Sequence, residues 1–118
     1  MSARSACARQ VADSDPYMFG FGMQDTVGYA EGLIGVRATF IRRAGRAAGD
    51  AVDRDKLAPL LAAVRAGNAA LTRLAAADVA GDTAAVAAGV ARFDARTEPE
   101  RAISRRLGLG DCLARPAG

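Results

Sequence analysis

Alanine constrains this chain most: it supplies 29 of the 118 residues and nearly half of the 51% that count as hydrophobic. Alanine is the best helix former, but its side chain adds little volume to a core. Only 31 larger hydrophobic residues remain to fill an interior. The composition therefore predicts a small all-α protein with a thin core, built as one domain over residues 1–118.

The apolar residues recur at helical spacing in four segments, and no segment alternates as a strand does. The first segment predicts a short helix over residues 2–13. The second predicts a helix from residue 24 to about residue 49, with Asp25 or Thr26 as its N-cap. In this second helix the small residues Gly28, Gly32 and Gly35 are expected to let another backbone approach closely.

The third segment follows a polar break over residues 50–55 and carries a regular stripe of leucine and valine. If Asp55 caps this helix, Pro59 falls in its first turn, where proline is tolerated. Gly81 is placed to end the helix in a left-handed turn.

The fourth segment begins with Asp82 and Thr83 as candidate N-caps and continues through Phe93 and Thr97 on one face. Pro99 predicts a kink near Glu98, or two helices that meet there. The helical pattern resumes over residues 102–107 and ends at a glycine, either Gly108 or Gly110.

Three long helices and one short helix, joined by short turns, predict an up-and-down bundle. Residues 13–23 form a hydrophobic loop in this prediction, and residues 113–118 form a loose tail. The loop contains the segment Tyr17 to Met23, with half of the aromatic residues and two glycines.

Charge and composition exclude several classes of function. Fifteen of the 16 basic residues are arginine, and they alternate with 13 acidic residues to leave a net charge of +3. This pattern is typical of a solvated mixed-charge surface, so no nucleic-acid partner is expected. The chain has no histidine, which removes histidine-based acid/base catalysis and the common zinc sites. We therefore predict no catalytic residues, no metal and no cofactor.

No apolar run approaches 18 residues, so no membrane-spanning helix is expected. The first residues lack the apolar core of a signal peptide, and Arg4 argues against a lipoprotein box at Cys7. The protein is then either cytoplasmic or an exported chain whose signal segment is absent from this sequence.

The two cysteines, Cys7 and Cys112, lie near opposite ends of the chain. In an up-and-down bundle of four helices both chain ends lie at the same end of the bundle, so a disulfide between them is geometrically reasonable. A bridge closing a loop of about 100 residues stabilises by roughly 4.7 kcal/mol in the chain-entropy model. Two separate buried thiols in a cytosolic protein are the alternative.

The C-terminal half carries a resemblance. Residues 71–82, the alanine-rich helix that follows them and the ending Leu107-Gly-Leu-Gly-Asp-Cys112 resemble a loose group of small exported helical proteins from high-GC Gram-positive bacteria. Members of that group typically have a signal or lipoprotein segment, an early cysteine and a closing motif of this kind. The resemblance implies export and a bridge between Cys7 and Cys112, and it implies no activity.

Two regions are candidate sites. The aromatic segment is a candidate partner-binding surface, through an apolar patch of Tyr17, Met18, Phe19, Phe21 and Met23. Small residues around the two phenylalanines of the helices leave room for a ligand pocket between helices, lined by Glu31, Arg37, Phe40, Asn68 and Phe93.

The favoured hypothesis is a non-enzymatic, exported interaction protein. It would dock on a larger protein or envelope-associated complex through its aromatic, glycine-rich segment, with peripheral membrane contact left open. The alternative is a small-ligand carrier or sensor with a pocket between helices. An enzyme is the least favoured, because no constellation of residues points to a reaction.

Overall fold

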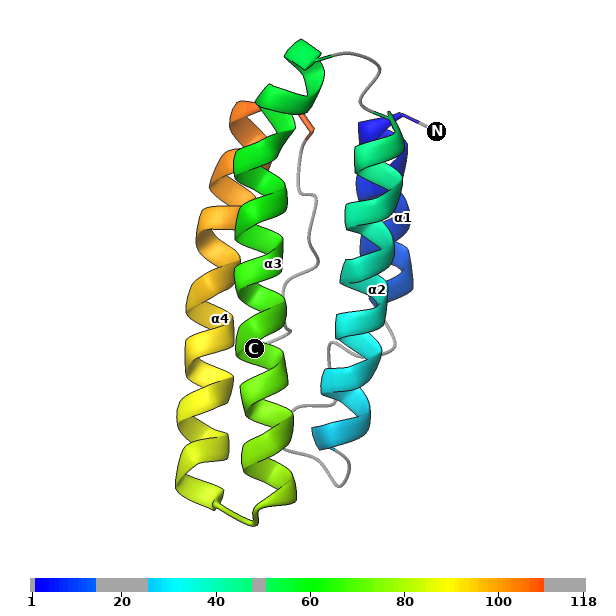
Figure 1. Ribbon diagram of the computed structural model, residues 1–118. Helices are drawn as coiled ribbons and strands as arrows, with labels where there is room; N and C mark the ends of the chain where they lie inside the picture. Colours follow the sequence, from blue (N-terminus) through cyan, green and yellow to red (C-terminus); the bar gives the residue numbers. More distant parts are fainter. Residues whose placement is uncertain (1, 15–25, 48–50, 110–118) are drawn as a thin grey trace.

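The computed structural model describes residues 2–14, 26–47 and 51–109, and folds them into four helices without a strand. These are α1 (Ala3–Ser14), α2 (Thr26–Ala47), α3 (Ala51–Val79) and α4 (Thr83–Arg106). Successive helices run in opposite directions, and each packs against the helix before it (Figure 1). The prediction of an all-α bundle is confirmed.

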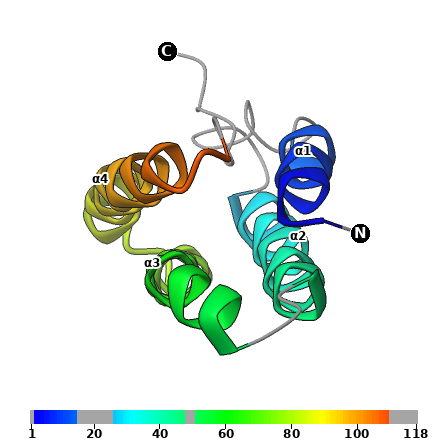
Figure 2. The same ribbon diagram turned by 90° about the horizontal axis from the view of Figure 1, so that it is seen from above.

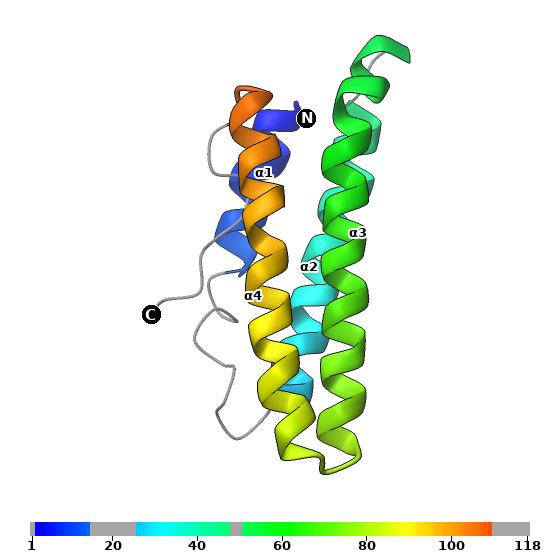
Figure 3. The ribbon, with the colours of Figure 1, turned by 90° about the vertical axis from the view of Figure 1, so that its left-hand side faces the viewer.

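The helices follow one another around the bundle, from α1 and α2 on one side to α3 and then α4 on the other (Figure 2). α3 and α4 lie antiparallel along most of their length (Figure 3). Among the described residues, the backbone of α4 comes close only to that of α3. Any link between α4 and α2 must therefore be made by long side chains.

Ser2, which was not predicted as a cap, is the N-cap of α1. The Ser2 hydroxyl oxygen accepts a hydrogen bond from the Ser5 backbone N–H at 3.1 Å, which is the geometry of an N-cap. The predicted span of residues 2–13 is within one residue of the observed helix at each end. In α2, Thr26 is the first helical residue, and Asp25 lies outside the described residues.

The predicted start of the third helix is wrong. α3 begins at Ala51, so residues 51–55 belong to the helix and Pro59 lies inside it. The four charged residues from Asp53 to Lys56 are all exposed, and an exposed turn of helix accommodates them without a break. Pro59 is also exposed, so the backbone carbonyl that loses its hydrogen bond can be reached by water.

Pro99 does not divide the fourth helix. α4 runs as one helix from Thr83 to Arg106 with Pro99 inside it, so the prediction of two helices is wrong. The proline faces solvent, while Phe93, Thr97 and Glu100 on the other face are buried. Burial of that face against the bundle outweighs the loss of one backbone hydrogen bond on the outside.

The predicted end of α3 and both predicted ends of α4 are confirmed. Asp82 caps α4, because its side chain accepts a hydrogen bond from the Ala85 N–H at 3.0 Å. Gly81 and Gly108 both adopt positive φ angles, 72° and 73°. After each of these glycines the next N–H bonds back to a carbonyl five residues earlier, as in a Schellman motif.

The apolar interior consists of two clusters. The Phe40 cluster contains Ala6, Cys7, Phe40, Ala44, Leu60 and Val64. The Phe93 cluster contains Ala30, Leu33, Ala70, Leu71, Leu74 and Phe93. Each cluster has one aromatic residue, and its buried alanines let the helices pack closely. The small number of large side chains is thus divided between two separate centres.

Both described ends of the chain lie at the same end of the bundle. Arg4 of α1 donates a hydrogen bond to the Gly108 carbonyl at 3.0 Å, and Leu107 and Leu109 pack against the Phe40 cluster. A disulfide between Cys7 and Cys112 would require the two ends of the chain to lie together in this way. Cys7 is buried in that cluster, and Cys112 and residues 113–118 lie outside the described residues.

One of the three glycines predicted to allow close approach, Gly35, does not do so. Gly35 is exposed, and a Cβ atom added there would meet nothing within 4 Å. Close contacts occur instead at Gly89, where an added Cβ would lie 3.1 Å from Leu74, and at Gly67. The expectation for Gly35 is therefore wrong, and Gly67 becomes important for the site described next.

Candidate functional site

A charged group of side chains lies between the two apolar clusters. We call Arg37 of α2, Asn68 of α3 and Glu100 of α4 the polar layer. Arg37 is 3% exposed and Glu100 is 0% exposed. Charged residues are almost never this deeply buried unless they are paired, so the layer is the most unusual chemical feature of the described interior.

The Arg37 guanidinium is held by hydrogen bonds from three directions. Its Nε donates to Asn68 Oδ1 at 2.8 Å, and its Nη2 donates to the Val64 carbonyl at 3.2 Å. Both terminal nitrogens also donate to Glu100, with Nη1 lying 3.3 Å from Oε2 and Nη2 paired with Oε1. This two-point contact is the strongest geometry that an arginine and a carboxylate form.

The face of the guanidinium is used as well as its edge. The Arg37 Cζ atom lies 5.2 Å from the centre of the Phe93 ring, within the range of a cation–π contact. Arg37 therefore contacts α3 through Asn68 and Val64, and α4 through Glu100 and Phe93. Arg37 is thus a direct polar link between α2 and α4, whose backbones do not meet within the described residues.

Gly67 of α3 makes room for this ion pair. A Cβ atom added to Gly67 would collide with Arg37 Nη2 and would lie 2.7 Å from Glu100 Oε1. A glycine inside a helix is unfavourable by roughly 0.5 to 1 kcal/mol relative to alanine. Here its missing side chain is what allows the two charged groups to meet beside the α3 backbone.

Burial raises the pKa of the Glu100 carboxyl above its ordinary value of 4.5. The loss of solvation is the largest influence on this pKa. It outweighs the lowering by the charge and hydrogen bond of Arg37 and by the charge of Arg101.

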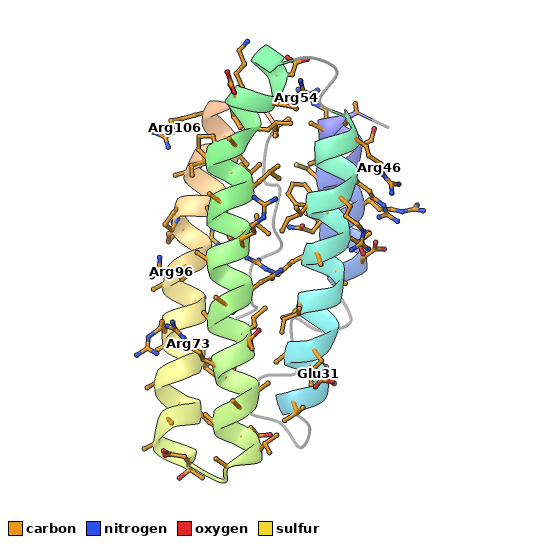
Figure 4. The ribbon with its side chains drawn as sticks, in the orientation of Figure 1. Glu31, Arg46, Arg54, Arg73, Arg96 and Arg106 are labelled. Atoms are coloured by element: carbon orange, nitrogen blue, oxygen red, sulfur yellow. The ribbon has the colours of Figure 1, made fainter. Side chains whose placement is uncertain are left out.

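The structure brings together three of the five residues predicted to line a ligand pocket. Arg37 and Asn68 are hydrogen bonded, and Phe93 lies against the guanidinium. Phe40 belongs to the other side of the layer, in the Phe40 cluster. Glu31 is exposed near the start of α2 (Figure 4). The structure thus brings Arg37, Asn68 and Phe93 together without Phe40 and Glu31, and the Arg37 guanidinium is bonded to the Glu100 carboxylate.

Glu100 is the site residue that sequence reasoning missed, although the signal was present. Phe93 and Thr97 were placed on one helical face, and steps of three and four residues from Thr97 reach Glu100 and Ser104. All four residues are buried. Because a proline usually interrupts a helix, the sequence pattern alone does not carry this buried face past Pro99 to Glu100.

An open groove lies on the surface between α1 and α2. Its volume is about 570 Å³. Small residues, Ala12, Gly32 and Gly35, line part of it, and charged residues, Asp13, Glu31 and Arg43, line another part. Arg43 and Asp13 form an ion pair across the two helices at 3.4 Å. The groove thus combines accessible backbone with charges of both signs.

The predicted partner-binding residues cannot be placed on this frame. Tyr17, Met18, Phe19, Phe21 and Met23 all lie outside the described residues. Within the described ranges no three histidine, cysteine or acidic side chains are grouped so as to hold a metal ion. No described helix is both long enough and apolar enough to cross a membrane.

Comparison with known proteins places the chain in no family. No protein-family model matches it, and searches of curated proteins and of solved structures return no significant match. The resemblance to small exported helical proteins stays a prediction, and the site must be interpreted from its own chemistry.

Proposed function

We propose that this protein is a non-enzymatic binding protein. It is exported, a disulfide between Cys7 and Cys112 closes its helical bundle, and it docks on a larger envelope-associated complex. The contact surface combines the groove between α1 and α2 with the aromatic segment of residues 17–23. The polar layer stabilises the bundle, because the bonds of Arg37 and Glu100 described above are made within the protein.

The groove between α1 and α2 is the observation that carries this proposal. Proteins recognise partners through surfaces where backbone and side chains are both accessible, and the exposed Gly35 offers such a place. Asp13 lines the groove in the last turn of α1, which includes the first two residues of the predicted loop, and the aromatic segment begins four residues later in sequence. A partner seated in the groove would therefore contact residues that lie only a few positions before the aromatic segment in sequence.

We expect substitution of Gly35 by tryptophan to fill the groove and to weaken partner binding about ten-fold or more, which corresponds to about 1.4 kcal/mol. A photo-crosslinker at the exposed Ala12 first identifies the partner in an envelope fraction. Titration calorimetry with that purified partner then compares the wild type with Gly35→Trp. Combined substitution of Phe19 and Phe21 by serine tests the aromatic segment in the same assay.

Gly45→Trp is the matched control, because Gly45 is also an exposed glycine of α2 with nothing within 4 Å of an added Cβ. It does not line the groove. We expect this variant to bind like the wild type. Equal binding by both tryptophan variants would reject the groove as the docking surface. A folded chain that crosslinks to no envelope protein would reject the proposed function.

The disulfide is supported by the position of the chain ends. Leu109, three residues before Cys112, packs against the cluster that contains Cys7. We expect protein taken from its native compartment to show no reactive thiol when it is denatured without reduction, and two after reduction. Two reactive thiols before reduction would contradict both the bridge and the export inferred with it.

A further inference from the structure

Arg101 is a buried charge that the polar layer leaves only partly bonded. It follows Glu100 on α4 and is 4% exposed. Its Nη2 donates to the Glu98 carboxylate. Its Nε and Nη1 atoms are buried and find no hydrogen-bond acceptor within residues 2–14, 26–47 and 51–109. A buried donor without an acceptor is costly, and more so when the group is charged.

The surrounding residues do not supply the missing acceptors. Both oxygens of Glu100 are engaged by Arg37. The hydroxyls of Ser104 and Thr97 donate to the backbone carbonyls of Arg101 and Asp94, and neither hydroxyl oxygen accepts from the Arg101 Nε or Nη1. Two buried arginines are thus served by one buried carboxylate. The carboxylate that pairs with Arg101 belongs to Glu98, whose side chain is mostly exposed.

Glu98 marks the side from which Arg101 can be reached. Its side chain is 60% exposed, although its carboxylate meets the buried guanidinium. Arg101 lies about 100° around α4 from Glu100, on the flank that also carries Asp94, Glu98 and Arg105. This flank is turned away from the contact that Gly89 makes with Leu74 of α3. Because the Glu98 side chain is mostly exposed, an anion from solvent can compete with its carboxylate for the guanidinium.

We propose that Arg101 is a binding site for a small oxyanion, either a carboxylate or a phosphate group. The oxyanion offers several acceptor oxygens and one negative charge, which together satisfy the open Nε and Nη1 positions. Charge-assisted bonds from arginine to carboxylate or phosphate are about twice as strong as neutral ones. A water molecule carries no charge, so its bonds to the guanidinium are weaker than those of an oxyanion. Glu98 acts as an internal competitor for the same guanidinium.

This site is independent of the docking surface proposed above. The groove lies between α1 and α2, whereas Arg101 lies on α4. Anion binding can therefore be measured on the purified chain without any partner, and either proposal can fail while the other stands.

The test is thermal and urea unfolding of the full chain at pH 7 in sodium phosphate, in sodium acetate and in sodium chloride of the same ionic strength. We expect phosphate or acetate to stabilise the wild type more than chloride does. At an anion concentration 100 times the Kd, the unfolding equilibrium constant falls about 100-fold. Phosphate also stabilises folded proteins without binding to a site, so the class of ligand is identified by the anion whose stabilising effect Arg101→Met reduces more.

Three variants make the test specific. Arg101→Met should lose the difference between the anions, and Glu98→Gln should bind the anion more tightly because the competitor is removed. Arg96→Gln, at an exposed arginine that points outward from the same helix, should respond like the wild type (Figure 4). The chemical shift of the Arg101 Nε–H group, followed by NMR during the titration, reports binding directly if Arg101→Met does not fold.

Two results would overturn the proposal. Equal stability of the wild type in all three salts would mean that an ordered water satisfies Arg101. An anion response that survives in Arg101→Met would mean that the ion binds elsewhere.

Discussion

Replacement of Glu100 by alanine is expected to lower the free energy of unfolding by about 3 to 5 kcal/mol, the range measured when one partner of a buried ion pair is removed. The loss arises because the Arg37 guanidinium would remain in the interior without its carboxylate. Domains of this size are stable by only about 5 to 15 kcal/mol, so a large fraction of the stability is at stake. Urea unfolding at pH 7, with the slope compared between variants, measures the change.

The matched control is Asp13→Ala, which removes the carboxylate of an ion pair with Arg43 whose two side chains are both partly exposed. Its effect should stay within about 1 kcal/mol, as for other surface ion pairs. The double variant Arg37→Met/Glu100→Leu should recover most of the stability, because replacing both charges removes the unpaired group. A Glu100→Ala variant no less stable than Asp13→Ala would show that the ion pair does not hold α4 to α2.

The same series has a pH dependence with a defined sign. Because burial raises the pKa of Glu100 in the folded state, the folded protein keeps a proton above pH 4.5 that the unfolded chain has lost. The contribution of Glu100 to stability is therefore largest below pH 4.5, and it falls as the pH rises through the raised pKa. The stability difference between wild type and Glu100→Gln should shift against the wild type over that window, whatever the other carboxylates do.

The sequence predicted those parts of the fold that depend on local rules. The leucine stripe of α3, the Asp82 cap and the turn at Gly81 follow from helical spacing and from the geometry of capping, which neighbouring residues alone determine. The predicted helix starts and ends were wrong at both of the prolines that lie in helices. Pro59 and Pro99 both lie inside helices, because each faces solvent while the other side of its helix is held by the bundle.

The polar layer could be predicted only in part, because it depends on contacts between helices. Arg37, Asn68 and Phe93 lie on or beside the apolar stripes of their helices, and on that basis the sequence predicts that they line a ligand pocket. Their role depends on Glu100, which lies 63 residues from Arg37 in sequence, and a local sequence pattern does not predict a contact across that separation. Gly67 was equally hidden, since a glycine in an alanine-rich helix looks like any other until the packed neighbours are known.

Substitution of Gly67 by alanine is expected to destabilise the protein by about 2 kcal/mol, within the range for overpacked interiors. Both groups that the new Cβ would meet are ends of long side chains, which could move aside at a surface. Here the Arg37 and Glu100 side chains are bonded to each other, and Asn68 and Val64 are bonded to Arg37 as well, so displacement of one side chain breaks several bonds.

Gly35→Ala is the control, and its expected effect has the opposite sign. Its Cβ meets nothing within 4 Å, so better helix propensity should stabilise that variant by about 0.5 to 1 kcal/mol. Chemical denaturation of the two variants beside the wild type measures both effects. Stabilisation by Gly67→Ala would mean that the ion pair tolerates a side chain at residue 67, and that the glycine is not there to make room for it.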